Sequence, residues 1–231
     1  MAIEQLRECN WVLIPGTLCT EDVFIPFLDE LEVSEDKRIS IKLDRPNVHD
    51  YETLLKEESK DAVVCGFSLG AIVAAHNAAV LNAKRIVLFG LNPLPDRPQN
   101  RDVRLSMEQS VMAFGGSYGL EKHVPEIQAM KVGGVKDKIL SMADRSSAYI
   151  QAQTQLALTR PDALSSLSAA RTTVMLLTGS NDSMTPPNLA EELTKKLTTC
   201  CFASLSGLGH YALLEDPKRC AHSYLELESR L

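Results

Sequence analysis

Residues 61–81 read DAVVCGFSLGAIVAAHNAAVL, and this stretch decides how the chain folds. A short apolar run precedes the pattern Gly-x-Ser-x-Gly at residues 66–70, and an alanine-rich apolar stretch follows it. This succession predicts a buried strand, a tight turn and a helix, with Ser68 at the apex of the turn. A serine in that position has its hydroxyl projected clear of the backbone, which is the arrangement of a nucleophile elbow.

The residues around Ser68 meet the physical requirements of such a turn. The flanking chains run close together, so the positions two before and two after the serine must lack bulk, and these are Gly66 and Gly70. The following helix directs free N–H groups and the positive end of its dipole at Ser68. The alternative is a glycine-flanked serine in an ordinary strand-to-helix turn, and the pattern alone does not exclude it.

Composition narrows the class of protein. The chain has 231 residues, 45% of them hydrophobic, which suits one α/β domain or one domain with an insertion. A formal net charge of −6 without basic runs argues against nucleic acid or an anionic membrane as a partner. No apolar run approaches the ~20 residues of a membrane span, and no signal-peptide pattern is present. The six cysteines lack metal-type spacing and are expected to be reduced. We therefore expect a cytoplasmic protein, as a monomer or homodimer.

Six short apolar segments predict strands, and helical stretches separate most of them. This repeated pattern predicts an α/β fold with a doubly wound, mostly parallel sheet of about six strands. Ligands bind such sheets at the carboxyl ends of the strands. The predicted strands cover residues 11–14, 39–43, 61–65, 85–90, 173–177 and 201–205.

Residues 93–171 break this rhythm, because they contain no convincing strand and far exceed the dozen or so residues that a crossover needs. We expect a helical insertion that forms a lid over the site, with residues 1–92 and 172–231 as the core. The alternative is a structural elaboration away from the site. The lid is favoured because loops at this edge of the sheet usually carry function.

A serine nucleophile needs a base and a group that orients the base. His210 follows the sixth predicted strand and Asp182 follows the fifth, so both reach the carboxyl edge of the sheet, where Ser68 lies. An aspartate in such a turn often bonds only to its own backbone. Here the chain order Ser68, Asp182, His210 is the order expected of a Ser-His-Asp triad on this kind of sheet.

An oxyanion hole would complete the site with two backbone N–H donors. One is expected from Leu69, the residue after the serine. The other is expected from Thr17, in the loop that follows the first strand, where Gly16 lets the chain turn back over the site.

Together these segments resemble the α/β-hydrolase superfamily, in particular its small, cap-bearing branch that includes the carboxylesterase of biotin synthesis and related esterases and lyases. The resemblance spans nearly the whole chain. It departs from the usual pattern at Pro15, where many members carry a histidine. The matching segments are LIPGTL at 13–18, GFSLG at 66–70, GSND at 179–182, GH at 209–210 and EDP at 215–217.

The resemblance implies a serine hydrolase that cleaves a carboxylic ester or thioester of a small apolar molecule through an acyl-enzyme, without a metal or cofactor. The alternative is a C–C bond hydrolase or a lyase of the pyruvate-eliminating type, since the same triad serves both and the sequence does not separate them. A non-catalytic binding protein is disfavoured because Ser68, Asp182 and His210 are all present.

The substrate pocket is expected to be apolar and adaptable. Its predicted lining residues are Leu18, Met107, Met112 and Phe114. Three arginines of the insertion could meet a substrate carboxylate, but arginines are mostly solvated, and we favour that interpretation for them. These arginines are Arg101, Arg104 and Arg145.

Overall fold

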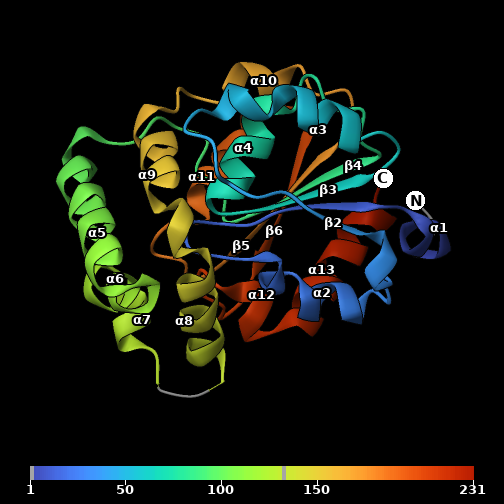
Figure 1. Cartoon of the computed structure of the whole chain (residues 1–231). Coiled ribbons are helices and arrows are strands. Elements are labelled where there is room, and N and C mark those ends of the chain that lie inside the picture. Colours follow the sequence, from blue (N-terminus) through green and yellow to red (C-terminus); the bar gives the residue numbers. More distant parts are fainter. Residues whose placement is uncertain (1–2, 132–133) are drawn as a thin grey trace.

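The computed structural model of the chain describes residues 3–131 and 134–231 (Figure 1). Residues 1–2 of the expected core and residues 132–133 of the expected insertion lie outside the described residues. A parallel sheet runs through the described part of the chain and has helices on both faces. No described helix is both long and apolar enough to cross a membrane.

The sheet has six strands in the order β2-β1-β3-β4-β5-β6, and each neighbouring pair is parallel. This confirms the predicted doubly wound α/β fold. The chain steps from β1 to one side and then returns to the other, so the topological switch point, where ligands bind such sheets, lies between β1 and β3. The strands are β1 (Trp11–Ile14), β2 (Arg38–Ser40), β3 (Val63–Phe67), β4 (Arg85–Phe89), β5 (Val174–Gly179) and β6 (Cys200–Leu205).

β2 is shorter than the alternation of apolar residues over 39–43 predicts. Ile39, Ile41 and Leu43 do contact the same core, as the alternation requires. The ladder nevertheless ends at Ser40, and Ile41 adds only one N–H bond to Leu13 O, at 2.9 Å. Within the described residues this edge strand pairs with β1 alone, which is itself four residues long.

Successive residues of the central strands serve two cores, because side chains alternate between the faces of a sheet. Leu13 and Cys65 belong to one core, and Val12 and Val64 belong to the other. The first core is covered by α1 (Ile3–Glu8), α2 (Ile25–Glu30), α12 (Ala212–Glu215) and α13 (Pro217–Ser229). The second is covered by α3 (Glu52–Glu58), α4 (Leu69–Asn77), α10 (Leu164–Ser168) and α11 (Asn188–Lys196).

The described residues between β4 and β5 form helices joined by loops and contain no strand, as expected for residues 93–171. In Figure 1, α5 to α8 stand together beside the sheet, whereas α10 lies in the same layer as α4. Leu156 and Leu167 share the core of α4, so the later part of this segment packs as a crossover onto the sheet. The helices not yet named are α5 (Arg101–Phe114), α6 (Gly116–His123), α7 (Pro125–Ala129), α8 (Val135–Ser146) and α9 (Ile150–Thr159).

An aromatic cluster fixes α2 and α13 against the sheet. The ring centroid of Phe27 lies 6.0 Å from that of Trp11, 5.3 Å from that of Phe89 and 6.0 Å from that of Tyr224, all edge to face. Such pairs contribute about 0.5–1.5 kcal/mol each beyond the area they bury. The cluster therefore anchors β1 and β4, whose carboxyl ends lead into the loops described next.

We expect Phe27→Ala to lower the free energy of unfolding by about 3–5 kcal/mol, because it leaves a cavity among closely packed rings. The matched control is Phe114→Ala, whose parent side chain is 67% exposed, and it should change stability by no more than about 0.5 kcal/mol. Chemical denaturation measures both. Equal effects of the two substitutions would contradict this account of the core.

Candidate active site

Ser68 stands at the junction of β3 and α4, with backbone angles φ 51° and ψ −114°. A positive φ is unfavourable for a residue that carries a side chain, and strain of this kind persists only where the surroundings impose it. The Ser68 N–H donates to the Phe89 carbonyl of β4 at 2.9 Å, which ties the turn to the neighbouring strand. The predicted strand, turn and helix are therefore present, with the serine at the apex.

The two glycines of the turn are required by close backbone contacts. A Cβ atom on Gly70 would lie 1.9 Å from the Ile14 carbonyl oxygen, and one on Gly66 would lie 2.7 Å from the Ala71 Cα. Both distances are well inside van der Waals contact. The start of α4 thus passes directly over the end of β1, and only glycine at position 70 allows this.

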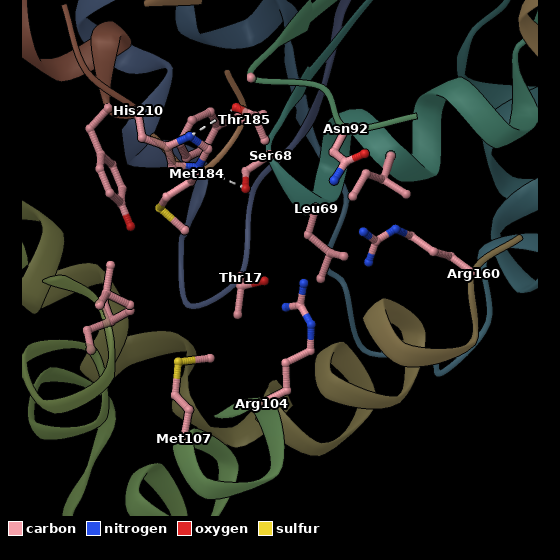
Figure 2. Close-up of a pocket in the computed structure, with 16 residues that line it drawn as sticks. Thr17, Ser68, Leu69, Asn92, Arg104, Met107, Arg160, Met184, Thr185 and His210 are labelled. Atoms are coloured by element: carbon pink, nitrogen blue, oxygen red, sulfur yellow. Dashed lines mark hydrogen bonds between the residues drawn. The ribbon is translucent and has the colours of Figure 1, made fainter. Parts of the chain in front are cut away.

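His210 and Asp182 lie beside Ser68 at the carboxyl edge of the sheet. His210 Nε2 is 3.0 Å from Ser68 Oγ (Figure 2). On the other side of the ring, His210 Nδ1 is 2.8 Å from Asp182 Oδ2. The side chains of His210 and Asp182 are 2% and 1% exposed. The fold therefore brings the three residues singled out by the sequence into one hydrogen-bonded chain. Two of them, His210 and Asp182, are shielded from water.

Asp182 receives further hydrogen bonds from the turn that follows it. The N–H groups of Met184 and Thr185 donate to Oδ1 at 2.9 and 2.8 Å, and the Thr185 hydroxyl donates to Oδ2 at 2.6 Å. Burial alone would raise the pKa of this carboxyl, but the donors on His210 and Thr185 outweigh burial and hold the pKa below its usual value. Asp182 is thus an anion aimed at His210.

The role of Thr185 was missed from the sequence. The only signal was its place three residues after an aspartate in a strand-end turn, where backbone and hydroxyl donors often meet the carboxylate. Many such threonines have no partner of this kind, so the signal is weak until the turn is seen.

The loop after β1 lies against Ser68 and presents Thr17 to the same pocket as Leu69. A Cβ atom on Gly16 would be 3.1 Å from Ser68 Cβ, which shows how closely this loop approaches. Among the described residues, neither the Thr17 nor the Leu69 N–H has a hydrogen-bond acceptor. Both amides are therefore available to a ligand oxygen, as the expected oxyanion hole requires.

Gln153 on α9 holds this loop in place. Its Oε1 accepts a hydrogen bond from the Leu18 N–H at 3.0 Å, and its side chain is buried. Leu18 has a φ of 54° and is 0% exposed, and it packs under the loop. The prediction that Leu18 lines the pocket was therefore wrong. The sequence could not indicate this contact, because 135 residues separate the two partners.

A cavity of about 120 Å³ opens beside Ser68. Met107 lines it as expected, together with other apolar residues of the insertion and the core. Its wall is formed by Thr17, Phe67, Ser68, Leu69, Ile72, Gly90, Asn92, Arg104, Met107, Leu120, Val124, Arg160, Met184, Thr185, His210 and Tyr211.

Met112 and Phe114 do not line the cavity and are 60% and 67% exposed. Both follow Met107 on α5, but helical geometry separates them from it. Met112 lies on a different face of the helix, and Phe114 lies two turns further along. The prediction that Met112 and Phe114 line the pocket was based on residue type, and it was wrong about where these side chains lie.

The arginines of the insertion divide into two groups. Arg101 and Arg145 are exposed, as expected, and Arg145 pairs with Asp22 of the core. Arg104 differs from the expectation, since its side chain is 27% exposed and lines the cavity. Arg160, to which the sequence gave no role in the site, is 1% exposed and lines it too. No cluster of His, Cys, Asp or Glu suited to a metal ion occurs among the described residues.

Comparison with known proteins agrees with this geometry. The sequence pattern of the alpha/beta hydrolase family matches residues 34–223. The chain belongs to the α/β-hydrolase family. A curated relative, the pimeloyl-[acyl-carrier protein] methyl ester esterase of Aromatoleum aromaticum, is 30% identical over 189 residues, which cover 74% of this chain and 75% of that protein.

Solved α/β structures share the same fold. The thermophilic esterase of Thermogutta terrifontis, determined with malate bound, has a TM-score of 0.71 at 19% identity, covering 96% of this chain and 90% of that one. The esterase of Exiguobacterium antarcticum has a TM-score of 0.74 at 14% identity, covering 96% and 92%. At these identities the likeness concerns the fold alone.

The hydrogen-bonded arrangement predicts that Ser68 is unusually reactive. A fluorophosphonate should modify Ser68, identified by peptide mass spectrometry, and Ser68→Ala should abolish the modification. Ser110 is a matched control, because its Oγ also lies 2.9 Å from a histidine nitrogen, on His123. It sits within the regular helix α5 without a strained turn. Modification of Ser110, or of the Ser68→Ala variant at the same rate, would contradict the assignment.

Proposed function

We propose that this protein is a serine hydrolase that cleaves a carboxylic ester or thioester of a small molecule through an acyl-enzyme. The observation that carries the proposal is the chain of hydrogen bonds from Ser68 Oγ through His210 to Asp182, at 3.0 and 2.8 Å. An ester substrate is favoured because the 30% identical relative is named as a methyl ester esterase.

In the acylation step, Ser68 Oγ attacks the carbonyl carbon while His210 Nε2 takes the hydroxyl proton. The resulting imidazolium is stabilised by Asp182, which keeps it in the orientation set by the Nδ1 bond. The carbonyl oxygen becomes an oxyanion and accepts hydrogen bonds from the N–H groups of Thr17 and Leu69. The tetrahedral adduct then collapses, and His210 returns the proton to the departing alcohol or thiol.

Deacylation repeats the same steps with water as the nucleophile. His210 removes a proton from water, hydroxide adds to the acyl carbon, and the proton passes to Ser68 Oγ as the acid leaves. Both halves require Asp182 to stay ionised, and its low pKa secures this.

We further propose that α5 to α8 act as a lid over this chemistry. Met107 of α5, Leu120 of α6 and Val124 after α6 supply apolar wall opposite Ser68. A cavity of about 120 Å³ is close in size to cavities of ~150 Å³ that bind benzene in an engineered protein core. The buried part of the substrate should therefore be short.

A series of p-nitrophenyl acyl esters tests the function. Acetate and butyrate should be turned over with a kcat/KM at least about tenfold above that of decanoate, because long chains exceed the cavity. Ser68→Ala should lower kcat by at least ~10³-fold, and a pre-steady-state burst of p-nitrophenol should report the acyl-enzyme. Turnover that survives Ser68→Ala would overturn the proposal. Phosphonate labelling of Ser68 without any ester turnover would instead favour the C–C bond chemistry.

Gln153 should influence the rate through the oxyanion loop. Gln153→Leu removes the acceptor for the Leu18 N–H and should lower kcat roughly 10- to 100-fold, less than the ~10²–10³-fold cost of losing an oxyanion donor outright. KM should change less than kcat, because the affected bonds strengthen in the transition state. Gln155→Leu, an exposed position on the same helix, is the matched control.

The turnover rates of the two variants should be divided by the concentration of active sites, which the burst amplitude measures. A loss of folded protein is then not mistaken for a lower kcat. A fall in amplitude at constant turnover per site would mean that Gln153 only supports the fold.

A further inference from the structure

The ionisable residues of the cavity wall are cationic or neutral. Apart from His210 and Tyr211, they are Arg104 and Arg160, and no carboxylate belongs to the described lining. In Figure 2 the Arg104 side chain rises from α5 toward Leu69, and Arg160 reaches in from the wall below Asn92. This is notable in a chain whose formal net charge is −6.

Both arginines share one buried carboxylate, that of Asp96. Arg104 donates from Nε to Oδ2 at 2.5 Å and from Nη2 to Oδ1 at 3.0 Å, while Arg160 Nη2 is 3.4 Å from Oδ1. Asn100 donates to the same Oδ1 at 3.1 Å. The Asp96 side chain is only 4% exposed. Two positive charges therefore face one negative charge, which leaves one positive charge uncompensated at the cavity wall.

Asp96 and Arg160 are both charged at neutral pH. Burial would raise the pKa of Asp96, but the bonds from Arg104 and Asn100 hold it below its usual value. Burial lowers the pKa of Arg160 to about 10, which still leaves the guanidinium charged. A partly buried, uncompensated cation is unfavourable unless an anion accompanies it.

Besides the backbone amides of Thr17 and Leu69, side-chain N–H groups of Arg104 and Asn92 have no acceptor among the described residues. Arg104 uses Nε and Nη2 on Asp96, so both N–H bonds of Nη1 remain. Asn92 accepts the Leu94 N–H on its Oδ1 at 3.1 Å, which leaves the Nδ2 amide group. Arg160 has no comparable freedom, because its Nε and Nη1 are bonded to the carbonyls of Leu94 and Ala157.

We propose that Arg104 and Asn92 form a subsite for a carboxylate group of the ester substrate. This rests on the proposed ester hydrolysis and names the substrate class for it. Arg104 supplies charge and the Nη1 donors, and Asn92 supplies an amide donor. Asp96, which also bonds Arg160, fixes the Arg104 guanidinium. The substrate then carries its ester carbonyl at Ser68 and its carboxylate at this wall.

The carboxylate can belong to the acyl part or to the alcohol part of the ester. Two pairs of esters distinguish these possibilities, one pair for each position. Monomethyl glutarate is compared with methyl valerate, in which a methyl group replaces the carboxylate. Carboxymethyl valerate is compared with isobutyl valerate. Hydrolysis of each is followed by titration at constant pH. In at least one pair, kcat/KM should be at least tenfold higher for the anionic ester, as expected for a charge-assisted hydrogen bond.

Arg104→Met should lower the anionic-to-neutral ratio of kcat/KM at least tenfold in that pair. Arg101→Met, an exposed arginine on the same helix, should leave the ratio unchanged. Because the ratio compares two esters on one enzyme preparation, partial unfolding cancels. A neutral preference in both pairs, or a ratio insensitive to Arg104→Met, overturns the subsite while leaving ester hydrolysis intact. Failure to cleave any of the four esters, or cleavage that survives Ser68→Ala, would instead count against the proposed function.

A second measurement needs no variant. Glutarate should inhibit hydrolysis of methyl valerate competitively, with an inhibition constant at least tenfold lower than that of the neutral glutaramide. Equal inhibition by the two compounds contradicts the subsite even if Arg104→Met does not fold.

Discussion

The close passage of the elbow helix over the end of β1 is the constraint on which the site depends. Because a Cβ on Gly70 would lie 1.9 Å from the Ile14 carbonyl oxygen, the start of α4 can come this near only at a glycine. Ser68, at the turn before this contact, has a positive φ, and the loop after β1 lies beside the serine. Ser68 and the amides of Thr17 and Leu69 thus lie together at one backbone crossing, at the switch point between β1 and β3.

Two buried carboxylates near the cavity are held ionised in different ways, and the difference sets the electrostatics of the site. Asp182 is surrounded by neutral donors and His210, so its negative charge is directed at the imidazole. Asp96 is divided between Arg104 and Arg160, so a positive charge remains on the opposite wall. The first arrangement places a negative charge beside His210, whereas the second leaves a positive charge on the cavity wall, as the proposed carboxylate subsite requires.

The helices between β4 and β5 contribute to the site in two distinct ways. α5 and α6 supply wall residues such as Arg104 and Met107, which bear on what can enter. α9 supplies Gln153, which bonds the loop after β1 at Leu18. Residues of α5 and α6 therefore face the cavity, whereas Gln153 contacts the loop that carries Thr17. This separation is physically expected where chemistry sits on strand ends and recognition sits on an added segment.

The sequence by itself determined the parallel sheet, the turn at Ser68 and the candidates Asp182 and His210, because these depend on local hydrophobic periodicity, on glycine and on chain order. It could not determine which side chains of the insertion face the cavity: Met107 does, while Met112 and Phe114 do not. It also could not reveal that Gln153 bonds the loop at Leu18, or that Arg104 and Arg160 share Asp96. Gln153 lies 135 positions from Leu18, and Arg160 lies 64 positions from Asp96. Arg104 is only eight positions from Asp96, but the direction of its side chain is set by how α5 packs.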